Sequence, residues 1–267
     1  MDTLGERRRA ADLPPGENSM IGRSLRKMAR SLGYEVFRSD LAIAPRDLAI
    51  LKRISDFTMT PPQRVLGLID AIRHVVESRI EGDVVECGVW RGGSMMSAAL
   101  TLLDAGDTSR TLHLFDTFEG MPPPTEKDRT RAGRLASDVL AATRRKEGYS
   151  VWAYASFDDV QRNLASTGYP AERVRLVRGK VEDTIPGNAP ERIAVLRLDT
   201  DWYESTRHEL EHLYPRLVPN GVLIIDDYGH WAGSRQAVDE FLARCPLPKP
   251  FMHRLDYAGR LAIKPNG

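Results

Sequence analysis

Strand and helix patterns alternate along the chain from residue 82 onward, and this alternation limits the fold more than any other feature. Five short apolar segments have the length and composition of buried strands, at 83–89, 112–117, 174–179, 193–199 and 221–227. Strands that alternate with helices form a parallel sheet covered by helices on both faces. The tail from Phe251 to Lys264 has the pattern of a hairpin. We therefore expect an α/β fold with an antiparallel strand at its end.

Charge and cysteine content exclude several functional classes. The chain has 267 residues with a net charge of +1, which argues against a nucleic-acid-binding surface. No segment approaches the roughly 20 apolar residues of a membrane helix, and the start lacks the apolar core of a secretory signal. The two cysteines, Cys87 and Cys245, cannot form a disulfide framework or a zinc knuckle. We expect a cytoplasmic protein with no nucleic-acid or membrane partner.

The N-terminal part differs from the rest of the chain. Residues 1–19 are polar, whereas residues 20–57 carry apolar residues at helical spacing. We expect an arm and helical extension over 1–57 and the main domain over 58–267, where a helix follows Pro61 and Pro62. The extension could cap an active site or pack against another subunit, and a plain packing appendage fits equally well.

The stretch 120–150 interrupts the alternation of strands and helices. It begins with prolines and continues as a charged, weakly periodic run. A long insertion of this kind fits a lid over the ligand crevice, which in open α/β sheets lies at the carboxyl ends of the strands. A solvated surface loop fits the same composition equally well.

A glycine-rich turn follows the first predicted strand, with Glu86 two residues before Gly88 and Ser94 after Gly92 and Gly93. Glycines at such a turn allow a ligand to approach the backbone, and the following helix N-terminus favours an anionic group. A carboxylate inside the turn repels a pyrophosphate but accepts hydrogen bonds from an ammonium group. The pattern therefore indicates a zwitterionic ligand, such as the methionine end of S-adenosylmethionine.

Asp116 ends the second predicted strand. An acidic residue at this place typically accepts hydrogen bonds from the hydroxyl groups of a ribose. A helix N-cap or a turn-forming role explains the same residue about as well.

Three carboxylates follow two further strands: Asp199 ends one, and Asp226 and Asp227 end the next. Adjacent strands lie about 5 Å apart, so these side chains should meet at one lip of the sheet. Clustered carboxylates repel one another, and a hard cation such as Mg²⁺ resolves that repulsion. Asp201 could be a fourth ligand, a general base or a helix cap. The alternative to a metal site is that Arg197 neutralises one of these negative charges. Side chains alternate between the two faces of a strand, so Arg197 lies on the same face as Asp199.

The histidines give a weaker signal. His208 and His212 form an H-E-L-E-H sequence that satisfies the spacing of a zinc metalloprotease motif. No third ligand follows at a suitable distance, so a solvated helix face is the better interpretation. His230 follows the Asp226–Asp227 pair and could reach a bound substrate.

Five segments together resemble the macrocin O-methyltransferase family: FTMTPPQR, GDVVECGVWRGGS, FDTFEGMPPP, LDTDWYEST and DDYGHWAGSRQAVDEF. The resemblance runs from about residue 57 to the end of the chain. Enzymes of this family use S-adenosylmethionine and a metal ion to methylate sugar hydroxyls of antibiotics and related natural products. The resemblance implies a class I methyltransferase fold, with a seven-stranded Rossmann-like sheet whose last strand is antiparallel.

The resemblance also implies roles for individual residues. Glu86 and Ser94 would hold the amino and carboxylate groups of the cofactor, Asp116 the ribose, and Val181 and Glu182 would border the adenine. Asp199, Asp226 and Asp227 match the metal ligands, and Asp201 matches the proposed base. The implied cofactor site comprises Thr58, Met59, Thr60, Glu86, Gly88, Trp90, Ser94, Asp116, Thr117, Val181, Glu182 and Asp199.

The function that follows is Mg²⁺-dependent methyl transfer to a sugar hydroxyl in antibiotic biosynthesis. The acceptor would be a small-molecule glycoside or a nucleotide sugar. A catechol or other phenolic acceptor is the alternative within enzymes, because the metal site would look the same. A non-catalytic cofactor-binding module would not need the three carboxylates. The apolar N-terminal extension predicts a homo-oligomer, and the resemblance implies the same, because members of the family commonly form homo-oligomers.

Overall fold

The centre of the fold is a seven-stranded sheet with strand order β3-β2-β1-β4-β5-β7-β6. The computed structural model describes residues 43–143, 152–245 and 248–266. Strands β1 to β5 are parallel, β7 is antiparallel to β5, and β6 pairs with β7. The predicted fold class, including the antiparallel last strand, is confirmed. The strands are β1 Asp83–Cys87, β2 Leu112–Asp116, β3 Val174–Arg178, β4 Ile193–Leu198, β5 Leu217–Ile225, β6 His253–Arg254 and β7 Arg260–Ile263.

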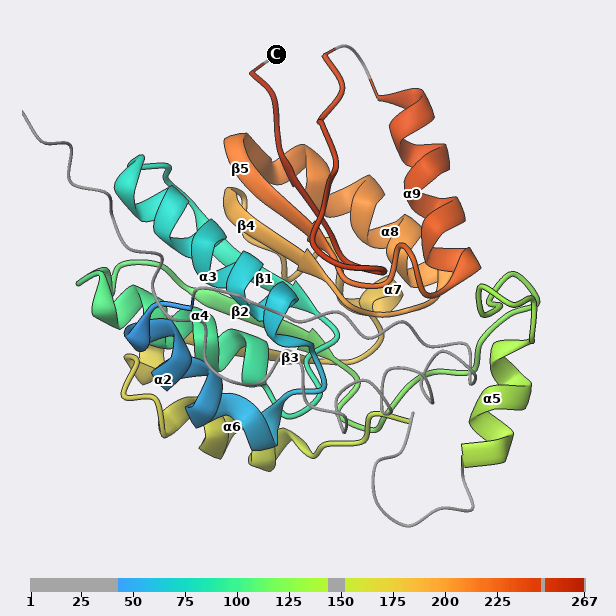
Figure 1. The fold of residues 1–267 in the computed structure, drawn as a ribbon, viewed down its shortest axis with the longest axis horizontal. Coiled ribbons are helices and arrows are strands. Elements are labelled where there is room, and N and C mark those ends of the chain that lie inside the picture. The colour runs from blue at the N-terminus through green and yellow to red at the C-terminus, as the bar shows by residue number, and fades with distance from the viewer. Residues whose placement is uncertain (1–42, 144–151, 246–247, 267) are drawn as a thin grey trace, which may run out of the picture. The chain divides into compact units, whose positions relative to one another are not determined.

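Helices cover both faces of the sheet (Figure 1). One core packs between the sheet and α2 Pro45–Ile54, α3 Pro62–Glu77, α4 Gly93–Asp104 and α6 Phe157–Ala165. A second core lies on the other face, against α7 Val181–Thr184, α8 Tyr203–Leu213 and α9 Ala232–Arg244. Short 3₁₀ turns span Ser55–Phe57, Ala171–Arg173 and Tyr214–Arg216. In the part of the chain that the structure describes, no helix is both long and apolar enough to cross a bilayer.

The strand order places a crevice at the carboxyl ends of β1 and β4. The chain builds outward from β1 to β3 and then returns to place β4 on the other side of β1. In open α/β sheets, ligands bind where the strand order reverses in this way. Gly88 sits at this point with φ 81°, and a Cβ atom there would collide with the carbonyl oxygen of Asp199. The turn after β1 can therefore run against β4 only because residue 88 is glycine.

Helix α2 falls within the predicted N-terminal extension, but its apolar side belongs to the main core. Ile50 and Ile54 are buried in the same cluster as residues of α3 and α4. The predicted helical pattern over residues 20–42 and the polar arm lie outside the described residues. The division of the chain at residue 57 stays a prediction.

The segment that follows β2 is anchored by a few buried residues, although many of its described side chains are exposed. Helix α5, Ala136–Thr143, contributes Ala136 and Leu140 to a small core with Trp202 and Trp231. Asp128 is fully buried and accepts hydrogen bonds from the amides of Thr125 and Tyr203, at 2.7 and 2.8 Å. The segment is thereby fastened to the first turn of α8. Residues 144–150 of the predicted insertion lie outside the described part of the chain.

Candidate active site

A cavity opens at the carboxyl ends of β1, β2 and β4, where the strand order predicts a ligand. Among the described residues, six of the predicted site residues do not line it: Thr58, Thr60, Glu86, Ser94, Asp226 and Asp227. Nine of the predicted site residues do line it: Met59, Gly88, Trp90, Asp116, Thr117, Val181, Glu182, Asp199 and Asp201. Residues from five separate stretches of sequence therefore converge on one crevice.

The turn between β1 and α4 forms one wall of the region around this cavity. Gly92 has φ 87°, and Ser94 is buried in the first turn of α4. The predicted Thr58–Thr60 segment lies against this turn, because a Cβ atom on Gly93 would collide with the Thr58 side chain. Met59 projects from the same segment and is 42 % exposed. The segment thus lies close to the predicted cofactor turn.

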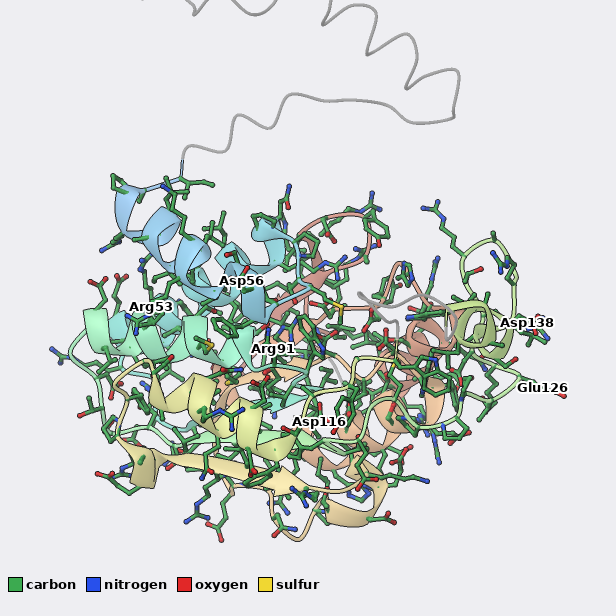
Figure 2. All side chains as sticks on the ribbon, turned by 90° about the horizontal axis from the view of Figure 1, so that it is seen from below. Arg53, Asp56, Arg91, Asp116, Glu126 and Asp138 are labelled. Atoms are coloured by element: carbon green, nitrogen blue, oxygen red, sulfur yellow. The ribbon has the colours of Figure 1, made fainter. Side chains whose placement is uncertain are left out.

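Asp116 lines the cavity and also holds the turn after β1. Figure 2 shows it on the same side of the molecule as Arg91 of the β1–α4 turn, away from Glu126 and Asp138. Its carboxylate accepts hydrogen bonds from the amides of Val89, at 2.6 Å, and Phe118, at 2.7 Å. Burial raises the pKa of Asp116. The residue therefore holds the turn in shape, whatever else it binds.

The structure brings Asp199, Asp226 and Asp227 together at the lip of the sheet. Each offers a carboxylate oxygen, and these oxygens lie within 4.8 Å of one another. Burial raises the pKa values of Asp199 and Asp227 well above the usual range, and the neighbouring carboxylates of the cluster raise them further. A group whose pKa is raised in this way favours a positive charge beside it, either a proton or a cation.

Two buried arginines contact the same cluster. Arg197 pairs with Glu86 and with Asp199 and Asp226, at 2.8 and 2.6 Å for the aspartates. Arg64 pairs with Asp226 and with Asp256, the latter at 2.8 Å. The sequence analysis offered neutralisation of the carboxylates by Arg197 as the alternative to a metal ion, and the structure shows the Arg197–Asp199 ion pair that this alternative requires. Arg64 was missed, because no local pattern connects the start of α3 with the end of β5.

The arginines do not neutralise the site. Glu86, Asp199, Asp201, Asp226 and Asp227 provide five carboxyl groups at this lip, against two guanidinium groups. One oxygen of Asp227 is buried without a hydrogen-bond partner among the described residues. A hard cation with oxygen ligands would satisfy that atom and the remaining charge. The donor set therefore fits Mg²⁺.

Asp201 lies between the cavity and the carboxylate cluster. Its backbone is left-handed, with φ 65°. Burial raises its pKa to about 7, and the charge of Asp199 contributes to the rise. Hydrogen bonds that Asp201 accepts from Asp227 and Trp231 lower its pKa and so act in the opposite direction. A carboxyl group with a pKa near neutrality is suited to accept and release a proton at physiological pH.

Other polar groups near the site have structural partners. His208 bonds the carbonyl oxygen of Ile185 at 2.9 Å, and neither His208 nor His212 belongs to the acidic cluster that could hold a metal among the described residues. His230 contacts the hydroxyl of Tyr257 at 3.1 Å. Glu209 is fully buried, and Thr200 donates a hydrogen bond to it at 2.9 Å. Glu209 and Asp128 were missed, because an isolated acidic residue on a helix or loop carries no sign of burial.

Comparison with known proteins gives consistent matches. The profile of the family described as macrocin O-methyltransferase (TylF) matches residues 46–261. It therefore includes all of α2 except its first residue, and it begins before residue 57, where the motifs placed the start. A Streptomyces olivaceus protein named 8-demethyl-8-(2,3-dimethoxy-alpha-L-rhamnosyl)-tetracenomycin-C 4'-O-methyltransferase is 38% identical over 193 residues, covering 72% of this chain and 70% of that protein. The mycinamicin III 3''-O-methyltransferase of Micromonospora griseorubida is 35% identical over 187 residues, covering 70% of each.

Solved structures agree with these sequence matches. The structure of the O-methyltransferase NovP has a TM-score of 0.67 and 31% identity, and covers 79% of this chain and 83% of that one. A structure of the O-methyltransferase TomG from Streptomyces achromogenes in complex with SAM has a TM-score of 0.51 and 14% identity, and covers 91% and 96%. The second likeness concerns the fold alone, which is that of S-adenosylmethionine-dependent methyltransferases.

Proposed function

Because this chain belongs to the macrocin O-methyltransferase family and is therefore an O-methyltransferase, we propose that it methylates a sugar hydroxyl in natural-product biosynthesis. The methyl donor would be S-adenosylmethionine, and the reaction would depend on Mg²⁺. The two relatives are named as methyltransferases of the 4'-oxygen of a rhamnosyl-tetracenomycin and of the 3''-oxygen of mycinamicin III. The acceptor would be a small-molecule glycoside or a nucleotide sugar.

The cavity and the turn beside it supply groups for each part of the donor. S-adenosylmethionine presents its methyl group on a positively charged sulfur atom. Glu86 would accept from the amino group, since one of its oxygens is buried with no hydrogen-bond partner among the described residues. Ser94 would take the carboxylate at the N-terminus of α4, where the helix dipole favours negative charge. Asp116 would bind the ribose, and Val181 and Glu182 would border the adenine.

Asp199, Asp226 and Asp227 would hold the metal ion. A Mg²⁺ ion there would lower the pKa of the acceptor hydroxyl and fix its position. Asp201 would accept the proton of that hydroxyl, because its pKa of about 7 allows it to be ionised at neutral pH. Trp202 and Trp231, packed beside α5, would help to exclude water from the reacting groups.

The observation that carries this proposal is the carboxylate cluster of Asp199, Asp226 and Asp227, of which Asp199 lines the cavity. The experiment is methyl transfer from labelled S-adenosylmethionine to a panel of sugar and phenolic acceptors. EDTA should abolish turnover and Mg²⁺ should restore it, while binding of S-adenosylhomocysteine stays nearly unchanged. Transfer to phenolic acceptors alone would favour the alternative acceptor class.

A variant pair separates a metal site from a salt-bridge cluster. Asp227→Asn should reduce the rate strongly with little loss of stability, because the carboxylate acts on the bound acceptor. Asp138→Asn, on the exposed side of α5, is the matched control and should behave as the wild type. Full activity in EDTA, together with a large loss of stability in Asp227→Asn, would contradict the metal role.

A further inference from the structure

A second cavity, of about 410 Å³, opens next to the acidic cluster. Ligand pockets are commonly of roughly 300–1,000 Å³, so this one is large enough for a small molecule. Five arginines line it: Arg129, Arg131, Arg235, Arg254 and Arg260. Tyr228, His230, Trp231 and Tyr257 supply aromatic surface. In the described part of the chain no carboxylate lines this cavity, which we call the arginine pocket.

Three distant segments build the arginine pocket. The turn that carries Arg129 and Arg131 is held against the start of α9, where the amide of Ala232 donates to the carbonyl oxygen of Arg129 at 2.8 Å. Arg235 comes from the first turn of α9. Arg254 and Arg260 lie directly opposite each other on β6 and β7. Like charges at opposite positions of an antiparallel pair are destabilising, so this arrangement has a cost for the fold.

Most of these positive charges lack a counter-charge. Among the described residues, Arg131 and Arg254 have no carboxylate within ion-pairing distance, and Arg129 and Arg260 donate only to backbone carbonyl oxygens. Only Arg235 forms an ion pair, with Asp239 at 3.5 Å, and both side chains are more than half exposed. Burial lowers the pKa of Arg260, and the charges of Arg254 and Arg235 lower it further. An anion in the pocket would relieve this repulsion.

The arginine pocket adjoins the proposed reaction centre. The carbonyl oxygen of Asp227 accepts hydrogen bonds from the amides of His230 and Trp231, at 2.9 and 3.1 Å, and both residues line the pocket. Asp199, on the other side of the cluster, lines the cofactor cavity. The acidic cluster therefore lies between the two cavities. An acceptor whose hydroxyl reaches the cluster has room for the rest of its structure among the arginines.

We infer that the arginine pocket binds the diphosphate of a nucleoside-diphosphate sugar, so that the sugar is methylated while it is still nucleotide-linked. This inference rests on the proposed function. The planar guanidinium group matches phosphate oxygens in a two-point contact, and several arginines suit a group with two negative charges. Tyr257 is 58 % exposed and offers a ring on which a base can stack. A neutral glycoside would supply no negative charge to Arg129, Arg131, Arg254 and Arg260, which form no ion pair among the described residues.

Calorimetry on the full chain tests the inference with uridine and thymidine diphosphate as probes. Thymidine, inorganic pyrophosphate and glucuronate serve as comparisons. We expect the nucleoside diphosphates to bind more tightly than all three, and to bind more weakly as salt increases. The double variant Arg131→Gln, Arg254→Gln should lose about tenfold or more in affinity, since each removes a charged contact. Both positions are exposed, so the fold should be retained.

The control variant is Arg175→Gln, an exposed arginine on β3 outside the pocket, which should bind the diphosphates as the wild type does. Binding of S-adenosylhomocysteine, measured in all three proteins, reports on the cofactor site alone and should be unchanged. If S-adenosylhomocysteine fails to bind, the proposed function fails. If it binds while the nucleoside diphosphates do not, or while the double variant binds them normally, only the arginine pocket inference fails. Glucuronate or pyrophosphate binding as tightly as the nucleoside diphosphates would also overturn it.

Discussion

Replacement of Arg197 with methionine tests how the acidic cluster is stabilised. Arg197 is buried and contacts Glu86, Asp199 and Asp226. Methionine retains much of the side-chain volume but removes the charge. Removal of one partner of a buried ion pair costs about 3–5 kcal/mol, because the remaining charge stays buried and unpaired. For a domain of this size we expect the melting temperature to fall by roughly 6–20 °C.

The stability lost in Arg197→Met should increase as the pH rises. Burial already raises the pKa of Glu86 from 4.5 to about 7 in the presence of Arg197. Without the arginine, the folded-state pKa rises further, and the folded protein binds a proton more tightly than the unfolded protein does. Stability of the variant should therefore fall as pH rises from about 4.5 through 7 and beyond. The difference from the wild type should be larger at pH 8 than at pH 5.

Denaturant unfolding in EDTA, at both pH values, provides the measurement. Arg192→Met is the matched control, because Arg192 pairs with Glu81 at an exposed site, and such pairs contribute about 0–1 kcal/mol. Mg²⁺ added to Arg197→Met should restore part of the lost stability if the cluster binds a cation. An Arg197→Met protein as stable as the wild type at pH 8 in EDTA would refute the view that this arginine holds the carboxylates together.

Further predictions concern the turn, the α5 segment, the ribose contact and assembly. Gly88→Ala should abolish binding of S-adenosylhomocysteine in calorimetry, because a Cβ atom collides with the carbonyl oxygen of Asp199; wild-type affinity would contradict this. Asp128→Ala should lower the free energy of unfolding in urea by about 2–4 kcal/mol, because the amides it accepts from lose their partner; a change within error would count against it. Asp116→Ala should weaken cofactor binding in calorimetry by about 1–3 kcal/mol, and an unchanged affinity would remove the ribose assignment. Light scattering at micromolar concentration should detect at least a dimer, as the N-terminal extension predicts, and a monomer alone would refute that.

Much of the fold could be predicted from the sequence because its signals are periodic or local. The apolar strand segments and the helices after them predicted a parallel sheet, and the final hairpin pattern predicted the antiparallel pairing of β6 with β7. The convergence of Asp199, Asp226 and Asp227 was also predictable. Parallel strands end at the same edge of a sheet, so residues at the ends of β4 and β5 must be neighbours.

The partners of those carboxylates were decided by tertiary structure. Alternation along β4 indicated that Arg197 could face Asp199, but its further contact with Glu86 depends on how β1 pairs with β4. Arg64 reaches Asp226 across 162 positions of sequence. Such a contact depends on how α3 packs on the sheet, which no local pattern specifies.

The arginine pocket shows most clearly the difference between what the sequence predicts and what the tertiary structure decides. The sequence by itself determined that the chain has many arginines and a polar insertion after β2, features that indicate neither a site nor a ligand. Only the tertiary structure placed Arg129, Arg235 and Arg260 around one cavity beside the acidic cluster. The physical reason is that a binding pocket is formed by loops and strand ends that meet across the fold. Their meeting depends on packing and turn conformation, whereas periodicity in the sequence records only which side of each helix or strand is buried.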